Sequence, residues 1–427
     1  MYLDRSQAPT IVDFVIDKPL QPKVLNTLSG VTIHILQNTI QPVVRVEFVF
    51  KAGKWYQSKA GVASLTAKIL KEGTIHKTAK QIADTIDFYG ASLEVTHGFD
   101  RSTLTLYCLS KFLKDLLPLA LEIIQAPSFP EEEFDILKQR VIQTLSVDKQ
   151  KNSYLSSESF TSVIYGKDHP YSTFINEEDI AALTVSDLRE FHSKAYGIST
   201  AEIFIAGDLH QEPLEVLLTT FQKNYLEEEK ASQFLQFYQE KASVIELYKA
   251  SPNTMQASVR IGKPFLSPTH DDYPGLYLLN HVFGGYFGSR LMKNIREDKG
   301  FTYGIYSSIS IREQGVLFSI GTDIKSDKVK ETLAEVNEEL KKLTLSLVPD
   351  EELKTVKKHL AGKFMSESST IFDKMDKYKA TVLLNLPPSY FTNLQEKVNL
   401  LLADDLQRIA EKHFDYTSMY RIVVGGI

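Results

Sequence analysis

The stretch Phe283-Gly-Gly-Tyr-Phe-Gly-Ser-Arg-Leu-Met-Lys-Asn-Ile-Arg-Glu-Asp-Lys-Gly-Phe-Thr-Tyr-Gly-Ile-Tyr-Ser307 holds a turn, a helix and a strand in one run. Its glycine-rich part, 284–288, favours a tight turn because glycine lets the backbone bend and approach its neighbours closely. Ser289 can cap a short helix, whose apolar residues follow at helical spacing. Gly300 suits the left-handed residue after that helix, and a strand is expected over 301–311.

Two long polar side chains flank the turn between this helix and this strand. Arg296 lies at the end of the helix, and Tyr303 lies seven positions later (303 − 296), near the start of the strand. Side chains on either side of so tight a turn can be directed at one spot, which is typical of a binding site. The alternative is structural: a solvated arginine at a helix end and a half-buried tyrosine in a strand.

Length and composition bound the interpretation. The chain has 427 residues, which suits about two domains, and its formal net charge of −6 favours neither nucleic acid nor an anionic membrane as a partner. The single cysteine, Cys108, lies in an alternating run and is interpreted as a strand residue, not a nucleophile. The sequence shows no signal-peptide core and no apolar run of membrane length, so we expect a cytoplasmic protein.

The second part of the chain repeats the order of elements in the first. The helix start Pro130-Glu-Glu-Glu-Phe134 recurs as Pro349-Asp-Glu-Glu-Leu353, 219 positions later (349 − 130). The strand at 203–208 recurs at 421–426, 218 positions later (421 − 203). Matched spacing between matched elements predicts a duplication. We therefore expect an α+β fold of two homologous domains, each a mixed or antiparallel sheet packed with helices. The expected ranges are 1–225 for the N-terminal domain, 226–245 for a linker and 246–427 for the C-terminal domain.

The pattern Ser289-Arg-Leu, then Ile295-Arg-Glu-Asp-Lys-Gly-Phe-Thr-Tyr303, resembles the second half of the pitrilysin/insulinase superfamily of zinc peptidases, in its processing-peptidase-like branch. The resemblance covers nearly the whole chain and implies two halves that face each other across a cavity, together forming half of a clamshell. In that family an arginine and a tyrosine at this spacing reach toward the substrate from the half opposite the metal. The resemblance thus implies that Arg296 and Tyr303 bind substrate.

Active members of the family carry an inverted zinc motif, H-x-x-E-H, on an early helix. Here the flanks survive at Gly61-Val-Ala and Lys71-Glu-Gly-Thr74, but the motif in register reads Ser64-Leu-Thr-Ala-Lys68. Both histidine ligands and the glutamate base are therefore absent. The family's third ligand, a glutamate on a later helix, falls at Gln143 or Thr144. The resemblance thus implies no catalytic residue and no metal ligand in this chain.

The spacing of the histidines leads to the same expectation without the family. No two of the ten histidines lie within one helical turn of each other along the sequence, so a helix-borne zinc pair is not expected. His169, before Pro170, is interpreted as a residue that orders a loop. Lys68 is either a solvated helix lysine or a charge that replaces the metal and holds nearby acidic groups. Nucleophile-elbow and phosphate-loop motifs are absent from the sequence.

These features predict a non-catalytic subunit of a heterodimeric zinc metallopeptidase, in which Arg296 and Tyr303 hold peptides or unfolded segments. The expected partner is a homologous subunit with an intact H-x-x-E-H motif, which would hold the zinc, and a homodimer is the other arrangement considered. This chain itself is expected to hold no cofactor and to bind neither nucleic acid nor membrane. Two other classes stay open: a structural protein, as in the cores of respiratory complexes, and a peptide-binding clamp without a peptidase partner.

Overall fold

The computed structural model describes residues 6, 21–27, 30–209, 214–215, 218–219, 246–251 and 253–426. We call the described residues up to 219 the first half and those from 246 onward the second half. The predicted linker, 226–245, lies outside the described residues. Within them, no helix has the length and apolar character needed to cross a membrane.

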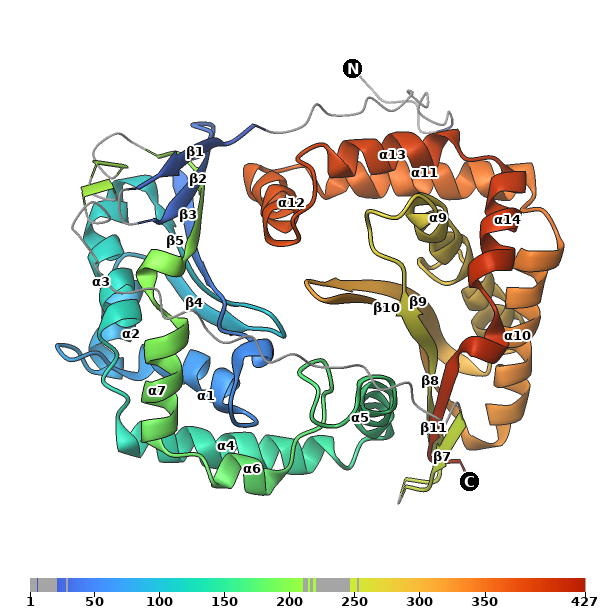
Figure 1. Ribbon diagram of the computed structural model, residues 1–427, viewed down its shortest axis with the longest axis horizontal. Helices are drawn as coiled ribbons and strands as arrows, with labels where there is room; N and C mark the ends of the chain where they lie inside the picture. The colour runs from blue at the N-terminus through green and yellow to red at the C-terminus, as the bar shows by residue number, and fades with distance from the viewer. Residues whose placement is uncertain are drawn as a thin grey trace.

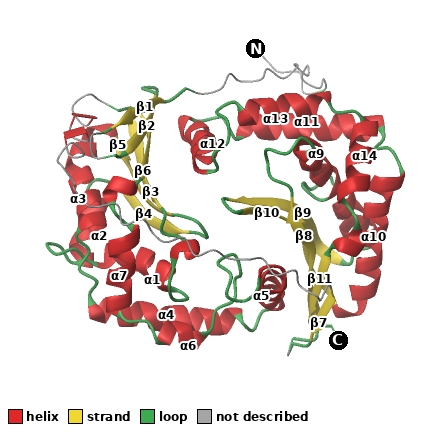
Figure 2. Ribbon diagram, viewed as in Figure 1, coloured by secondary structure: helices red, strands yellow, loops and turns green. Residues whose placement is uncertain are grey.

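The first half packs its helices against a mixed sheet (Figures 1 and 2). In the described residues this sheet has the strand order β1-β2-β6-β3-β5-β4, in which β2 and β6 are parallel and the other neighbours are antiparallel. The strands are β1 (Lys23–Asn26), β2 (Thr32–Gln37), β3 (Val43–Phe50), β4 (Ser92–His97), β5 (Ser102–Leu109) and β6 (Glu202–Gly207). The helices are α1 (Val62–Ile69), α2 (Ala79–Phe88), α3 (Leu113–Gln125), α4 (Glu131–Asp148), α5 (Asn152–Tyr165), α6 (Glu177–Ala181) and α7 (Val185–Ala195).

The second half has the same layers. Its sheet, in the described residues, has the order β7-β11-β8-β10-β9, in which β7 and β11 are parallel and the other neighbours are antiparallel. The strands are β7 (Glu246–Lys249), β8 (Gln256–Phe265), β9 (Thr302–Arg312), β10 (Gly315–Lys325) and β11 (Tyr420–Val424). The helices are α9 (Tyr273–Phe283), the π-helix Met292–Asp298, α10 (Val329–Leu345), α11 (Asp350–Ser366), α12 (Ile371–Leu383), α13 (Tyr390–Leu400) and α14 (Ala403–His413).

The two strand orders match position by position. β7, β11, β8, β10 and β9 take the places of β2, β6, β3, β5 and β4, and each neighbouring pair runs in the same relative direction in both sheets. The predicted duplication of an α+β domain is therefore confirmed. Alternation along the strands separates the two faces of each sheet. Val46 and Phe48 of β3, for example, belong to the core under the helices of the first half, whereas Val49 belongs to a different cluster.

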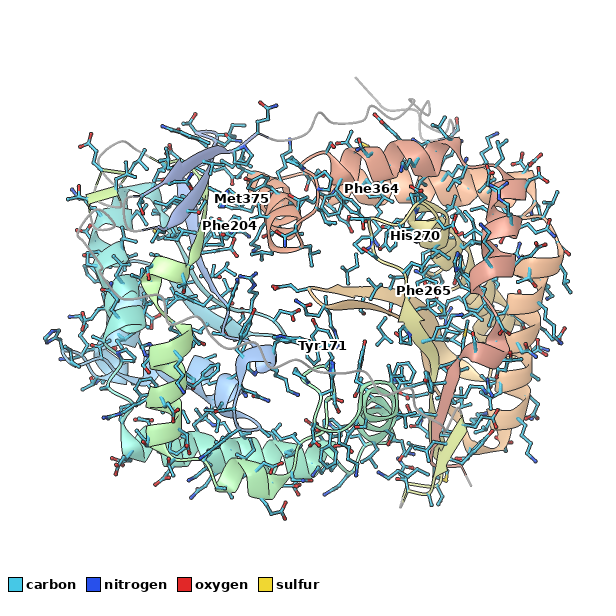
Figure 3. The ribbon with its side chains drawn as sticks, in the orientation of Figure 1. Tyr171, Phe204, Phe265, His270, Phe364 and Met375 are labelled. Atoms are coloured by element: carbon cyan, nitrogen blue, oxygen red, sulfur yellow. The ribbon has the colours of Figure 1, made fainter. Side chains whose placement is uncertain are left out.

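Each half also supplies a helix to the sheet of the other half (Figure 1). From the first half, α5 packs against β8 and β11, where Phe160 contacts the cluster that contains Ile422. From the second half, α12 packs against β2 and β6, where Met375 joins Val49 and Phe204 in one apolar cluster. Figure 3 shows Met375 and Phe204 close together, on α12 and on the facing strand. Each exchanged helix thus packs on the sheet of the other half, on the face opposite that half's main helix layer.

Ion pairs join α12 to the first-half sheet on which it packs. Lys379 Nζ lies 2.7 Å from a carboxylate oxygen of Glu47, and Arg45 lies 2.8 Å from Asp376. Glu47 is buried, so this pairing joins charges that have largely lost their water. Removing one partner of such a pair is costly, and the halves are therefore held together by more than apolar contact.

Candidate functional site

Arg296 lies on an irregular helix. The sequence predicts an ordinary helix over 290–296, but Met292–Asp298 is a π-helix, a rare arrangement that is frequent at functional sites. The Ser289 hydroxyl is buried and has no hydrogen-bond partner in the described structure, so the predicted capping role of Ser289 is wrong. Gly300 follows in the left-handed region, with a φ of +65°, as its position predicts.

Tyr303 lies on a β-bulge. Thr302 pairs with Ile324, whereas Ile305 pairs with Thr322, so two residues of β9 oppose one residue of β10 between these pairs. A bulge of this kind bends a strand and redirects a side chain. The Gly304 carbonyl accepts hydrogen bonds from the Thr302 and Thr322 hydroxyls, at 3.0 and 2.9 Å, which fixes the bulge.

The structure brings Arg296 and Tyr303 together through the main chain. Arg296 Nε donates to the Tyr303 backbone carbonyl at 3.0 Å, and the guanidinium carbon lies 4.5 Å from the centre of the Phe287 ring. A second guanidinium nitrogen lies 3.7 Å from the Glu297 carboxylate. The Tyr303 side chain is 96% exposed, so it is not the half-buried strand tyrosine considered as the alternative. Its phenol is thus free to meet a ligand.

Phe287 is the neighbour that sequence reasoning did not single out. It lies in the glycine-rich turn, nine positions before Arg296 (296 − 287), and it is 57% exposed. An aromatic face under a guanidinium holds the cation in place while leaving its edge available for hydrogen bonds. The usable signal in the sequence was an aromatic residue among the glycines that precede the arginine.

The helix with the degenerate motif packs against the helix that would carry the third ligand, as α1 contacts α4. Ser64 is partly buried, and the three residues that follow it are buried, whereas Lys68 is exposed in the last turn of α1. The protein around it withdraws part of the water from its ammonium group, and this partial desolvation, followed by the charge of Arg140 on α4, lowers the pKa of Lys68. Lys68 makes no ion pair within the part of the chain that the structure describes. This geometry fits a solvated lysine better than a charge that holds acidic groups.

The position of the family's third ligand offers no donor set. Gln143 and Thr144 are both exposed on α4, and the Thr144 hydroxyl donates to the Arg140 carbonyl at 2.8 Å within the same helix. Among the described residues, no group of three or more His, Cys, Asp or Glu side chains could hold a metal ion. That this chain binds neither metal nor cofactor stays a prediction.

Two further residues are placed as the sequence predicts. Cys108 is buried in β5, and burial raises the pKa of its thiol to about 12, so the thiolate needed for nucleophilic attack is not formed near neutral pH. His169 Nδ1 accepts a hydrogen bond from the Tyr171 backbone N–H at 3.0 Å, and its ring stacks on Tyr165. Both contacts hold the loop in which His169 lies.

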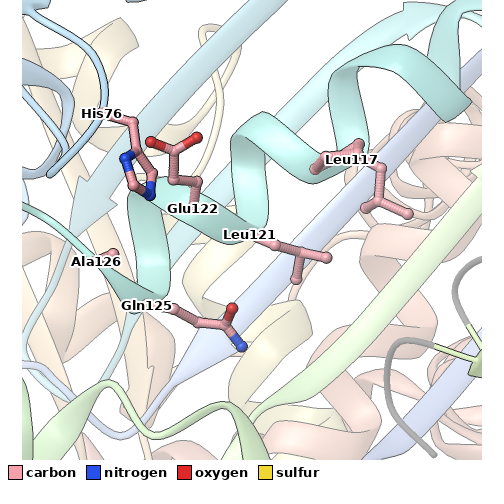
Figure 4. Close-up of a pocket in the computed structure, with 7 residues that line it drawn as sticks. His76, Leu117, Leu121, Glu122, Gln125 and Ala126 are labelled. Atoms are coloured by element: carbon pink, nitrogen blue, oxygen red, sulfur yellow. The ribbon is translucent and has the colours of Figure 1, made fainter. Parts of the chain in front are cut away.

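A pocket of about 320 Å³ opens on the first half, beside α3 (Figure 4). Leu117 and Leu121 of α3 supply apolar lining, and His76 lies next to Glu122 at one end. The Glu122 carboxylate accepts a hydrogen bond from the Thr74 hydroxyl, which explains its presence there in structural terms. The pocket contains neither Arg296 nor Tyr303, and it adds nothing to the candidate site.

Comparison with protein families gives two matches, which follow one another along the chain. Residues 32–172 match the family model described as insulinase (peptidase family M16). Residues 182–360 match the model described as the peptidase M16 inactive domain.

Curated relatives match along most of the chain. A protein of Helicobacter pylori named "Non-peptidase homolog YmxG" is 23% identical over 396 residues, which cover 91% of this chain and 90% of that protein. A protein of Bacillus subtilis named "Uncharacterized zinc protease YmxG" is 24% identical over 390 residues, with 89% and 92% covered. A crystal structure described as a peptidase M16 inactive domain from Pseudomonas fluorescens has a TM-score of 0.84 at 24% identity, covering 95% of this chain and 98% of that one. This last likeness concerns the fold alone.

Proposed function

The chain belongs to the insulinase family of peptidases, M16, as an inactive homologue, and on that premise we propose that it is the substrate-binding, non-catalytic subunit of a heterodimeric zinc metallopeptidase. Its substrates would be peptides or unfolded segments. The partner would be a homologous subunit with an intact H-x-x-E-H motif, and that subunit would hold the zinc and the general base. This chain would supply Arg296 and Tyr303.

The observation that carries the proposal is an exposed phenol beside a held guanidinium. Tyr303 is 96% exposed on its bulge, and Arg296 is fixed by the Tyr303 carbonyl and by the Phe287 ring. A guanidinium and a phenol can both donate hydrogen bonds to a peptide carbonyl and to the oxyanion that forms when water attacks it. In an assembled enzyme, loss of one such donor typically costs about 2.7–4 kcal/mol of barrier.

The placement of β9 suits an extended ligand. In the described residues β9 is the outermost strand of the second-half sheet, and β10 is its strand neighbour. An edge strand offers main-chain groups to a peptide that adds as a further strand, while exposed side chains select among peptides. Tyr303 lies at the start of that strand, and Arg296 reaches it from the preceding π-helix, so both could meet the peptide bond that is cleaved.

The test is reconstitution with a homologous M16 subunit that retains H-x-x-E-H, preferably one encoded beside this chain. We expect the purified chain to hold no tightly bound zinc by elemental analysis and to cleave no peptide, and we expect the mixture to cleave peptides. Hydrolysis by this chain alone, or one zinc per chain, would contradict the assignment. Peptide binding by the chain without activity in any mixture would favour the clamp, and a stable inactive assembly without peptide binding would favour a structural protein.

A further inference from the structure

The two matched hairpins of the molecule meet at their turns. The turn between β4 and β5, residues 98–101, contacts the turn between β9 and β10, residues 312–314, and Tyr171 from the loop after α5 lies between them. We call this contact the junction. Tyr171 is 1% exposed, and Figure 3 shows it between the two halves. The Tyr171 side chain is therefore shielded from water where the hairpins meet, whereas the turn residues around it are partly exposed.

Arg312, the last residue of β9, sits in an aromatic cage supplied by the first half. Its guanidinium carbon lies 3.8 Å from the centre of the Phe99 ring, 4.6 Å from Tyr171 and 5.8 Å from Tyr165. One guanidinium nitrogen also donates to the Tyr171 carbonyl at 3.3 Å. A planar cation between aromatic rings is held in direction as well as in position, which an ammonium group on a flexible stem would not reproduce.

Polar contacts close the junction around the cage. The Tyr171 hydroxyl donates to Asp100 at 2.7 Å and accepts from the Gln314 backbone N–H at 3.0 Å. The Glu313 N–H donates to the other Asp100 oxygen at 3.3 Å, and the Glu313 side chain pairs with Arg101. Because these bonds share the partners Asp100 and Tyr171, they fix the two turns as a unit rather than as separate contacts.

The same strand carries the junction and the candidate site. β9 runs from Thr302, next to Tyr303, to Arg312, nine residues beyond Tyr303 (312 − 303). At about 3.3 Å per residue, this separates the two places by about 30 Å of continuous strand. One end of β9 is thus anchored on the first half, and the other end presents the phenol. A displacement at the anchored end moves the strand and, with it, the placement of the site relative to the first half.

We propose that Arg312 is a positioning residue: its cage in the first half sets where β9 presents Tyr303 and Arg296 to a peptide held in the assembled enzyme. The inference rests on the proposed function, since it concerns how that site is aligned. Alignment matters at this scale because a misplacement of about 1 Å can lower the rate of an enzyme about a hundredfold.

The first measurement needs no partner subunit. The chain has one tryptophan, Trp55, whose ring centre lies 5.1 Å from that of Tyr171, so its fluorescence reports on the junction directly. We expect Arg312→Lys and Arg312→Ala to shift the Trp55 emission and to raise its quenching by acrylamide. Arg421→Lys is the matched control, because Arg421 also lies over an aromatic ring, Tyr416, and should leave Trp55 unchanged. Unchanged fluorescence in both Arg312 variants would overturn the junction's role.

The second measurement is a double-mutant cycle in the reconstituted pair. Arg312→Lys should lower kcat by about tenfold. Tyr303→Phe should then lower kcat much less in the Arg312→Lys variant than in the parent chain, because a misaligned phenol already contributes little to the reaction. Effects of residues this far apart otherwise add. If Tyr303→Phe lowers kcat and the two effects are additive, the positioning role is wrong and the proposed function stands. If Tyr303→Phe has no effect by itself, the proposed function fails and the positioning role fails with it.

Discussion

The connection from a helix to an edge strand occurs twice in this molecule, and the two copies differ in regularity. In the first half, α2 is an α-helix with a capping box between Thr78 and Gln81, and β4 pairs with β5 without a register shift. In the second half, a π-helix precedes β9, and β9 contains a bulge. Both copies turn at a left-handed glycine, Gly90 and Gly300, with φ of +59° and +65°. The topology is common to both, and the irregularities are confined to the copy with the candidate site.

Counting from these glycines shows what the irregular copy has changed. Four positions before the glycine (90 − 86 and 300 − 296) stand Ile86 and Arg296, and three positions after it (93 − 90 and 303 − 300) stand Leu93 and Tyr303. Ile86 and Leu93 are buried in the core of the first half, whereas Tyr303 is almost wholly exposed. The second copy thus has two polar side chains at the positions where the first copy has two apolar core residues. A strained or irregular backbone that persists at such a place is a reason to suspect function.

The largest difference should appear in stability at the matched positions after the glycines. Leu93→Ala should lower the free energy of unfolding by about 2–5 kcal/mol, because it opens a cavity in a packed core. Tyr303→Ala should change that free energy by less than about 0.5 kcal/mol, because the side chain is exposed. Urea unfolding of both variants measures the contrast. An equal loss at both positions would show that Tyr303 supports the fold.

The next effect concerns the reaction of the reconstituted pair. Tyr303→Phe removes one hydroxyl, and Arg296→Lys removes the planar set of donors, and each should lower turnover by about tenfold to a thousandfold. Melting temperatures should stay close to that of the parent chain, since neither change opens a large cavity. Full turnover with lowered stability would show that Arg296 and Tyr303 support the fold and do not bind substrate. The two connections would then not differ in function.

A smaller effect, on the pH dependence of stability, should distinguish the helix pair α9 and α11 of the second half from the matched pair α1 and α4 of the first half. α9 and α11 place His281 Nε2 2.9 Å from His359 Nδ1, whereas the matched pair, α1 and α4, contains no histidine. Burial, and next the charges of His359 and Lys363, lower the pKa of His281 to about 3. An unfolded histidine titrates near pH 6.5, so the unfolded chain binds the proton first as the pH falls.

The stability that neutral His281 contributes is therefore fully present above about pH 6.5 and is lost progressively as the pH falls from 6.5 toward 3. Between pH 7 and pH 5 the loss should be about 2 kcal/mol. Replacing His281 by Gln removes this titration and should reduce the acid sensitivity by that amount, measured by urea unfolding at both pH values. The same acid sensitivity in the Gln variant would show that other groups cause it.

The smallest effect concerns the ring under Arg296. Phe287→Leu keeps apolar contact but removes the cation–π interaction, which is worth about 0.5–1 kcal/mol at an exposed site, so turnover should fall about two- to fivefold. Phe88→Leu is the control from the regular connection, because Phe88 is 82% exposed at the end of α2 and contacts Tyr89 instead of a cation. A matching loss in the control would mean that the assay responds to exposed aromatics in general.

The sequence predicts the parts of this fold that depend on local chemistry. Gly90 and Gly300 mark helix ends, and Pro130 and Pro349 mark helix starts, because φ restriction and lost donors act within a few residues. The proximity of Arg296 and Tyr303 could be predicted for the same reason, since the two residues lie only seven positions apart in the sequence.

The remaining features depend on partners far along the chain. The π-helix follows from how the segment packs under β9, where the Ile305 N–H points to the Met292 sulfur at 3.4 Å, and nothing in residues 290–298 indicates it. The exchange of α5 and α12 was equally hidden, because an apolar stripe on a helix does not specify which sheet it covers. The role of Arg312 is hidden in the sequence for the same reason, because its aromatic cage comes from residues 99, 165 and 171.

The exchange of helices has a consequence for synthesis on the ribosome. α12 ends at Leu383, 176 residues after β6 completes the first-half sheet at Gly207 (383 − 207). At about 5–20 residues per second, the nascent chain waits about 9–35 s between these two points. During that interval the apolar face around Val49 and Phe204 lacks the helix that later covers it. The growing polypeptide thus exposes an aggregation-prone apolar surface throughout the second part of its translation. A chaperone that binds nascent chains would be most useful in this period.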